Sequence, residues 1–247
     1  MNISSDPYNN PKESVIKMDK YKRSISPGVT ATKPKYLLEV DDTLVYFKFG
    51  LTSDEIYAEL AAYNMGLKLN IPMAKTQISE YKGSLGIASF DIGNYTEVDD
   101  SDGYSMLKYL SIDGFIDMLL FDYLIMNEDR HAGNWGVFNN KVVPLYDHNI
   151  SFGATAETND FNYFMAHLTF PFTIHSDYDN SADKILEYIC RFYSDAVKDF
   201  LMKVNELDNI ETEYDAYMQK DLLKHKHDLF LYRKLYFNRL VNEYVNK

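Results

Sequence analysis

The sequence predicts an α+β fold arranged in two lobes, and three observations lead to this prediction. Runs rich in aromatic and β-branched residues, typical of strands, dominate the first third of the chain. Apolar residues at helical spacing dominate the remainder. Between them, residues 91–104 carry turn-forming residues without apolar periodicity. We therefore expect an N-lobe over residues 23–91, a linker over 92–104 and a helical C-lobe over 105–247.

Composition excludes several functional classes. The chain has 247 residues, of which 46% are hydrophobic, so it is neither collagen-like nor wholly disordered. Its net charge of −12 disfavours direct binding to nucleic acid, whose backbone is bound mainly by Lys and Arg. The single cysteine, Cys190, cannot form an intrachain disulfide, and no apolar run reaches the roughly 20 residues of a membrane helix. We expect a soluble, cytoplasmic protein that binds neither nucleic acid nor membranes.

The first elements are a flexible tail and a β-hairpin. Residues 1–22 are rich in Asn, Ser, Pro and Lys without periodicity, which predicts a loose tail. Two β-rich runs, Tyr36–Val40 and Leu44–Phe49, flank Asp41-Asp42, which predicts a hairpin. Because side chains alternate along a strand, Lys48 lies on the face opposite the apolar Val45, Phe47 and Phe49.

A helix and two strands complete the predicted N-lobe. Thr52-Ser53-Asp54-Glu55 is a typical helix start, and apolar residues follow it at helical spacing. Gly66 and Asn70-Ile71-Pro72 end this helix. Two short strands are expected next, at Met73–Ile78 and Leu85–Phe90.

The C-lobe is predicted to begin with an apolar helix over Ile112–Met126. Residues Val137–Tyr146 then alternate like a short hairpin that turns at Asn139-Asn140. Trp135, the only tryptophan, is interpreted as a core residue beneath the intervening loop. Further helical stripes continue through the rest of the chain.

Three polar residues are predicted to meet where the apolar helix stops. Asp129 and Asn134 lie on the loop after it, and Asp147 follows the second strand of the hairpin. Phosphoryl transfer from ATP requires a carboxylate to accept the proton of the attacking hydroxyl, and oxygen ligands for Mg²⁺. Protein kinases place an Asp and an Asn with this spacing, then another Asp after a strand pair. Spacing alone is uninformative in a chain so rich in Asp and Asn, so the whole arrangement carries the hypothesis.

The other polar residues of this loop are expected to support it. His131 and His148 lack the cysteine or His-x-x-x-His partner that a zinc site requires, so His131 is interpreted as bracing the loop. Arg130 is expected either to brace the loop as well or to pair with an acidic side chain.

The chain resembles HipA-like serine/threonine kinases, a family of bacterial toxin-type kinases. The resemblance covers residues 23–153 and rests on motifs rather than on composition. These motifs are Asp129-Arg130-His131 with Asn134-Trp135-Gly136, Pro144-Leu145-Tyr146-Asp147, Ser24-Ile25-Ser26-Pro27-Gly28 through Lys33-Pro34-Lys35, and Asp54-Glu55 through Gly66 with Ile71-Pro72. The resemblance implies a two-lobed fold related to protein kinases and phosphoinositide kinases, in a short version without an additional N-terminal subdomain. The segment that resembles the phosphate loop carries extra residues.

The resemblance also implies roles for individual residues. Asp129 would be the catalytic base, while Asn134 and Asp147 would hold magnesium. Lys48 would neutralise the phosphates of ATP, as the lysine of a kinase N-lobe strand does. Ser89-Phe90-Asp91 falls where the lobes join, so its backbone is expected to bind adenine.

Two glutamates compete for the pairing with Lys48. Glu55 corresponds to the helix glutamate of the family and could orient this lysine. Thr52-x-x-Glu55 also fits a capping box, in which Glu55 only caps the helix. Glu59, one turn later on the same face, is an equal candidate.

The hydroxyl-rich segment before the first strand is expected to cover the ATP phosphates. Ser26 and Gly28 would contact the nucleotide there. A serine in the corresponding loop of related kinases becomes phosphorylated and silences them, so Ser24 and Ser26 are our candidates for autophosphorylation.

These residues together predict an ATP- and Mg²⁺-dependent kinase that phosphorylates serine or threonine on a protein, with an antitoxin as a candidate partner. Two alternatives stay open, a small-molecule or lipid kinase of the same fold and a degenerate module that binds nucleotide without turnover. The lack of a basic amphipathic helix disfavours a lipid substrate. The joint presence of Lys48, Asp129, Asn134 and Asp147 disfavours the degenerate module.

Overall fold

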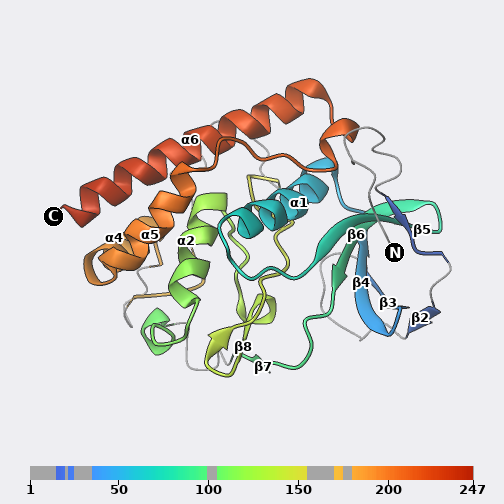
Figure 1. Ribbon diagram of the computed structural model, residues 1–247, viewed down its shortest axis with the longest axis horizontal. Helices are drawn as coiled ribbons and strands as arrows, with labels where there is room; N and C mark the ends of the chain where they lie inside the picture. The colour runs from blue at the N-terminus through green and yellow to red at the C-terminus, as the bar shows by residue number, and fades with distance from the viewer. Residues whose placement is uncertain are drawn as a thin grey trace.

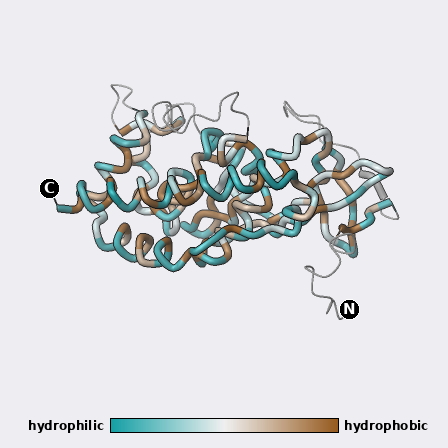
Figure 2. Tube along the Cα trace, turned by 90° about the horizontal axis from the view of Figure 1, so that it is seen from above, coloured by the Kyte–Doolittle hydropathy of each residue, from teal (hydrophilic) through white to brown (hydrophobic). Residues whose placement is uncertain are grey.

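The computed structural model describes residues 15–19, 22–24, 35–98, 105–154, 170–174 and 180–246. Figure 1 shows the strands of the N-lobe gathered at one end of the molecule and the helices of the C-lobe at the other. Figure 2 shows apolar residues on the inner sides of the helices, where the helices pack on each other.

A mixed six-stranded sheet forms the N-lobe, in the order β1-β5-β6-β4-β3-β2. Its strands are β1 (Ile16–Lys17), β2 (Lys22–Ser24), β3 (Lys35–Val40), β4 (Thr43–Phe49), β5 (Thr76–Tyr81) and β6 (Ser84–Phe90). The β3–β4 hairpin is confirmed: Asp41 and Asp42 both have positive φ, 48° and 63°, as a tight two-residue hairpin turn requires. This register places Lys35 directly opposite Lys48.

The prediction of a flexible tail is wrong for the end of residues 1–22. Ile16 and Lys17 pair in parallel with β5, and the Met18 N–H donates to the Glu80 carbonyl at 2.8 Å. The Met18 side chain is fully buried against the sheet, so burial and backbone pairing hold this segment in place.

Helix α1 (Ser53–Lys68) follows β4 and begins as the sequence predicts. Thr52 accepts the Glu55 N–H, and the Glu55 carboxylate accepts the Thr52 N–H at 2.7 Å, which completes a capping box. At its far end Gly66 packs so closely on Met73 that a Cβ there would lie 2.3 Å from the Met73 sulfur. A residue larger than glycine therefore cannot be accommodated without displacing Met73.

The described part of the C-lobe contains helices and, at one edge, a small three-stranded sheet (Figure 1). The helices are α2 (Phe115–Ile125), α4 (Ala182–Phe192), α5 (Ser194–Asn205) and α6 (Lys220–Val245), with 3₁₀ turns η2 (Met106–Lys108), η3 (Ala132–Asn134) and η4 (Asp215–Tyr217). The sheet contains β7 (Thr96–Glu97), β8 (Gly136–Phe138) and β9 (Lys141–Val142). The predicted hairpin turn is confirmed, with Asn139 and Asn140 at φ of 51° and 60°.

The predicted linker requires a correction. Thr96 and Glu97, inside residues 92–104, pair with β8, so this part of the linker is an edge strand of the C-lobe sheet. The chain that leaves the N-lobe is therefore attached to the hairpin beside the loop of Asp129 and Asn134.

One large apolar core joins α1 to the C-lobe helices, while a smaller cluster lies beneath the N-lobe sheet. Trp135 is fully buried, with its ring 5.1 Å from Tyr109 and 5.4 Å from Phe115, centroid to centroid, as the core interpretation expects. Among the described residues, no helix is long and apolar enough to cross a membrane.

Candidate functional site

The loop that carries Asp129 is fixed to the end of α2 by buried polar contacts. The Met126 residue that ends α2 adopts φ of 56° and turns the chain. Asn127 donates from its side chain to Asp122 at 2.8 Å and accepts the Asp129 N–H at 3.2 Å. The start of the loop is therefore set by a side chain that is itself held within the core.

Arg130 is the centre of this polar network and is completely buried. Its guanidinium forms a two-point ion pair with the buried Asp122, with distances of 2.8 and 3.0 Å. It also donates to the carbonyls of Asn134 and Tyr146, at 2.5 and 3.0 Å. Arg130 meets both of its alternative expectations: it pairs with an acidic side chain, Asp122, and it braces the loop through the Asn134 and Tyr146 carbonyls.

Arg130→Lys is expected to lower the free energy of unfolding by about 1–3 kcal/mol, because an ammonium cannot replace the planar fork and leaves buried acceptors unsatisfied. Chemical denaturation would measure the change. The exposed Arg191→Lys in α4 is the matched control and should shift stability by less than about 0.5 kcal/mol. Equal stability of the two variants would contradict the assignment of Arg130 as the organiser of the loop.

His148 completes the network on the other side of Arg130. Its Nε2 lies 2.8 Å from the Arg130 guanidinium, which can only donate, so this nitrogen accepts and the ring is neutral. Burial, with the nearby Arg130 and Lys48, lowers the pKa of His148 well below its usual value. His148 therefore serves as a buried acceptor, in keeping with its lack of zinc partners.

Asp129 and Asn134 lie side by side, as the sequence predicts. The Asn134 amide donates to the Asp129 carbonyl at 2.8 Å and to its Oδ2 at 3.2 Å. The Asp129 side chain keeps 42% of its surface exposed, and His131 Nε2 lies 3.8 Å from its Oδ1. Burial raises the pKa of Asp129 and outweighs the opposing effect of His131, while Asp147 adds a smaller increase. Asp129 is thus a half-exposed carboxylate with increased affinity for a proton.

His131 braces the turn after Asp129. Its side chain accepts the Gly133 N–H at 3.0 Å and caps η3, the turn that carries Asn134. The expected bracing role of His131 is confirmed.

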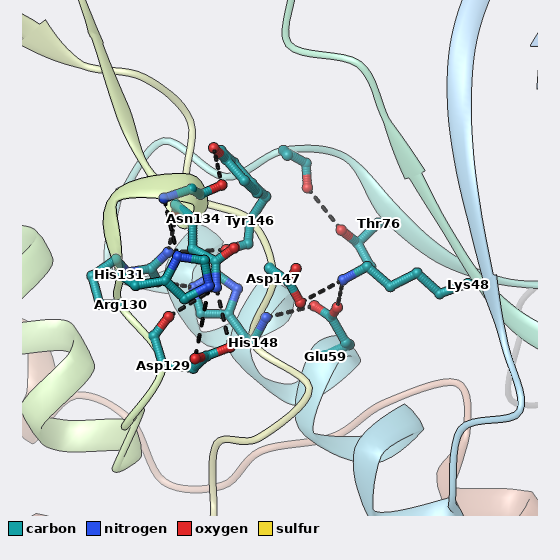
Figure 3. Close-up of polar contacts among 12 residues, drawn as sticks. Lys48, Glu59, Thr76, Asp129, Arg130, His131, Asn134, Tyr146, Asp147 and His148 are labelled. Carbon is teal, nitrogen blue, oxygen red and sulfur yellow. Dashed lines mark hydrogen bonds and ion pairs between the residues drawn. The ribbon is translucent and has the colours of Figure 1, made fainter. Parts of the chain in front are cut away.

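Lys48, on β4, and Asp147 meet across the two lobes (Figure 3). The hairpin ends at Val142, earlier than predicted, so Asp147 lies on the segment that follows β9. Lys48 Nζ lies 2.8 Å from Asp147 Oδ1 and also pairs with Glu59. Burial opposes both charges, but Asp147 and Glu59 together raise the pKa of Lys48, and Lys48 lowers the pKa of Asp147. Asp147 adopts φ of 61°, a conformation uncommon outside glycine, which points to a fixed local geometry.

The structure decides between the two glutamates. Glu59 is 2% exposed, pairs with Lys48 and accepts the His148 N–H on its other oxygen at 3.0 Å. Glu55 instead caps α1, with its carboxylate on the Thr52 N–H. Assigning Glu55 to the nucleotide site is therefore wrong: the capping geometry uses its carboxylate at the helix start, one turn before Glu59.

A pocket of about 450 Å³ lies between the lobes beside these residues. It is lined by Lys35, Tyr46, Lys48, Ala74, Ser89, Phe90, Asp91, Ile92, Gly93, Asn94, Tyr95, Gly133, Asn134, Tyr146 and Asp147. The segment Ser89-Phe90-Asp91 lines it as predicted. The Phe90 and Asp91 N–H groups already donate to the carbonyls of Lys75 and Leu44, each at 2.9 Å, so neither is available to adenine in this arrangement.

Sequence reasoning missed several lining residues. Lys35 lies opposite Lys48 on the neighbouring strand, and pairing within the predicted hairpin could have identified it. Tyr46 lies two positions before Lys48 on β4 and therefore on the same strand face, so the alternation of side chains could have identified it as a lining residue. Tyr95 and Tyr146 contact each other through their hydroxyls at 3.1 Å, and Tyr146 also donates to the Gly133 carbonyl. Tyr95 lies within residues 92–104, the predicted linker, and no sequence pattern there identifies it as a lining residue.

Three candidate residues of the phosphate loop have little or no structural description. Ser26 and Gly28 lie outside the described residues. Ser24 ends β2, where its backbone pairs with Leu37 of β3. The prediction of nucleotide contacts and autophosphorylation there stays a prediction.

The donor set of the site fits magnesium rather than a metal held by protein alone. Asp147 and Asn134 offer carboxylate and amide oxygens at the pocket wall, the hard ligands that Mg²⁺ takes together with substrate phosphates. In the part of the chain that the structure describes, no three His, Cys, Asp or Glu side chains gather into a metal site. A magnesium ion here would therefore depend on phosphate oxygens for much of its coordination.

No protein-family model matches the chain, and no curated protein sequence matches it. Its structure is similar to that of the Helicobacter pylori proinflammatory kinase CtkA, with a TM-score of 0.60 and 15% identity over 94% of this chain and 99% of that one. It is also similar to a chain of the Shewanella oneidensis MR-1 toxin–antitoxin system HipA, HipB and its operator DNA. That match has a TM-score of 0.59 and 11% identity, and it covers 91% of this chain and 68% of the other. The prediction of a two-lobed, kinase-like α+β fold is confirmed.

Proposed function

We propose that the chain is an ATP- and Mg²⁺-dependent serine/threonine protein kinase, a short member of the HipA-like kinases. The observation that carries the proposal is that Lys48, Asn134 and Asp147 line one interlobe pocket, with Glu59 paired to Lys48 and Asp129 in contact with Asn134. Active kinases require the pairing of the strand lysine with the helix glutamate, and here it is formed. The shared fold with the kinase CtkA supports the proposal.

Each residue has a definite task in phosphoryl transfer. Lys48, held by Glu59, binds the phosphates of ATP, and Lys35 beside it adds a second positive charge. Asp147 and Asn134 hold magnesium, which would neutralise charge that develops on the phosphates. Asp129 orients the acceptor hydroxyl and takes its proton on Oδ1, since Oδ2 already accepts from Asn134. The raised pKa of Asp129 favours this proton transfer.

The charges of the site explain why the metal is required. Two lysines, Lys35 and Lys48, and two carboxylates, Asp91 and Asp147, line the pocket, and the carboxylates of Glu59 and Asp129 lie next to Lys48 and Asn134. Arg130 adds no free charge because it is paired with Asp122. A nucleotide triphosphate would be repelled by the carboxylates unless a divalent cation screens them. Binding of ATP is therefore expected to depend on magnesium.

The proposal extends to a partner, to regulation and to location. The HipA structure belongs to a toxin–antitoxin system with HipB, and we propose an antitoxin as a partner of the chain. We further propose autophosphorylation at Ser24 or Ser26 and a cytoplasmic location, where ATP is available and a single cysteine stays reduced.

The experiment is incubation of the full chain with labelled ATP and cell lysate, followed by identification of the labelled species. Label on serine or threonine of a protein supports the proposal. Label confined to small molecules or lipids would replace it with a small-molecule or lipid kinase. Nucleotide binding without any turnover would identify a degenerate module.

A further inference from the structure

A buried lysine of the last helix contacts two segments that lead into the candidate site, α1 and the segment after Asp147. Lys226, on α6, is 3% exposed. Its Nζ donates to the Phe152 carbonyl at 3.2 Å and lies 3.5 Å from Asp54 Oδ2 in the first turn of α1. Figure 1 shows α6 reaching across the molecule to the region of α1. One ammonium group therefore bridges three separate parts of the chain.

Phe152 closes the segment 147–152, which begins at Asp147. Its N–H donates to the Ile125 carbonyl at 2.8 Å, and its ring meets that of Tyr57 on α1 edge to face, with 6.3 Å between centroids. The backbone of Phe152 adopts φ of 52°, a conformation that a residue with a side chain keeps only when its surroundings hold it. The Lys226 ammonium is one of the groups that hold it.

The same helix α1 carries the glutamate of the site. Glu59 pairs with Lys48 and accepts the His148 N–H, so α1 and the segment 147–152 are also joined at the pocket. A shift of α1 away from this segment would break the hydrogen bond between Glu59 and the His148 N–H, which holds the Glu59 carboxylate where it pairs with Lys48. In protein kinases, control of this pair through the position of the helix decides activity.

Burying an ammonium group is costly, so Lys226 requires compensation from the groups that it contacts. Burial lowers the pKa of Lys226, and Asp54 opposes that effect. Asp54 Oδ1 is itself buried without a hydrogen-bond partner among the described residues, so Lys226 is an important source of compensation for this carboxylate. Removal of the ammonium would leave the Phe152 carbonyl and the Asp54 carboxylate poorly compensated, which favours separation of α1 from the segment 147–152.

We propose that Lys226 is a positioning residue through which α6 holds α1 and the segment 147–152 together, so that Glu59 stays paired with Lys48 beside Asp147. The catalytic consequence rests on the proposed function, whereas the coupling itself rests on the contacts. In this way α6 supports the position of Glu59 on α1.

The test compares Lys226→Met, which keeps most of the length of the side chain and removes its charge, with Lys224→Met. Lys224 lies on the same helix with 80% of its side chain exposed and is the matched control. Hydrogen–deuterium exchange of the full chain should become faster in α1 and in residues 147–152 for Lys226→Met only. Turnover should fall on the order of 10-fold at little-changed KM for ATP, because the reacting groups are misaligned rather than removed.

A second variant guards against simple misfolding. Asp54→Asn removes the same ion pair at a position with 30% of its side chain exposed, and should give the same exchange pattern in weaker form. The effects of the two substitutions should be non-additive when combined, since both act through one interaction. If Lys226→Met lowers only Tm, and leaves exchange in these segments and kcat unchanged below the melting range, the positioning role is overturned. If the wild type transfers no phosphate, the proposed function fails while the exchange measurement still decides the coupling.

Discussion

Asp129→Asn is expected to reduce phosphoryl transfer on the order of 10²–10⁴-fold, the usual contribution of a general base. Asparagine keeps the size of the side chain and its contact with Asn134, but it cannot accept a proton from the acceptor hydroxyl. The Asp129 carboxylate lies outside the Lys48–Glu59–Asp147 ion pairs, so nucleotide affinity should change far less than turnover. Single-turnover kinetics with labelled ATP, beside calorimetry of ATP binding, separates the two quantities.

The matched control is Asp113→Asn, because Asp113 is an exposed carboxylate of the same lobe that pairs with Lys141 at 3.0 Å. It should retain wild-type turnover, since surface ion pairs contribute little. An Asp129→Asn variant that phosphorylates at nearly the wild-type rate would show that another group accepts the proton.

Asp147→Asn is expected to weaken the response to magnesium by more than the 10–100-fold that loss of a group supporting a metal ligand typically costs. A neutral amide replaces a charged ligand, and Lys48 loses one of its two carboxylate partners. Asparagine tolerates the positive φ of 61° at this position, so the backbone should keep its path. The dependence of turnover on magnesium concentration measures the effect.

Asp228→Asn on the surface of α6 serves as the control for this charge change. It should leave the magnesium dependence of turnover unaltered. A variant at Asp147 with the wild-type magnesium dependence would remove this residue from the metal site.

Local turn chemistry made much of the fold predictable. The Asp41-Asp42 and Asn139-Asn140 turns and the Thr52 cap all formed as expected, because each is determined by residues adjacent in sequence. The parallel pairing of Ile16 with β5 could not be predicted, since a two-residue strand has no periodicity of its own. The pairing of Thr96 with β8 could not be predicted for the same reason.

In the site, too, local features could be predicted and features that depend on tertiary packing could not. The sequence placed Asp129, Asn134 and Asp147 together, because a helix end and a hairpin determine their proximity. It could not choose between Glu55 and Glu59, which lie one turn apart on the same helical face and both suit a lysine partner. Only the distance between α1 and β4, a property of the packed fold, shows that Glu59 reaches Lys48.

Titration of ATP into the wild-type chain by calorimetry, with magnesium and then with a chelator, tests the central claim most directly. Tight binding with magnesium and strongly weakened binding without it is the predicted result, because the carboxylates of the site repel the bare triphosphate and Asn134 and Asp147 would contribute oxygen ligands to the metal. Equal affinity under both conditions, or no binding under either, would contradict a site built for phosphoryl transfer.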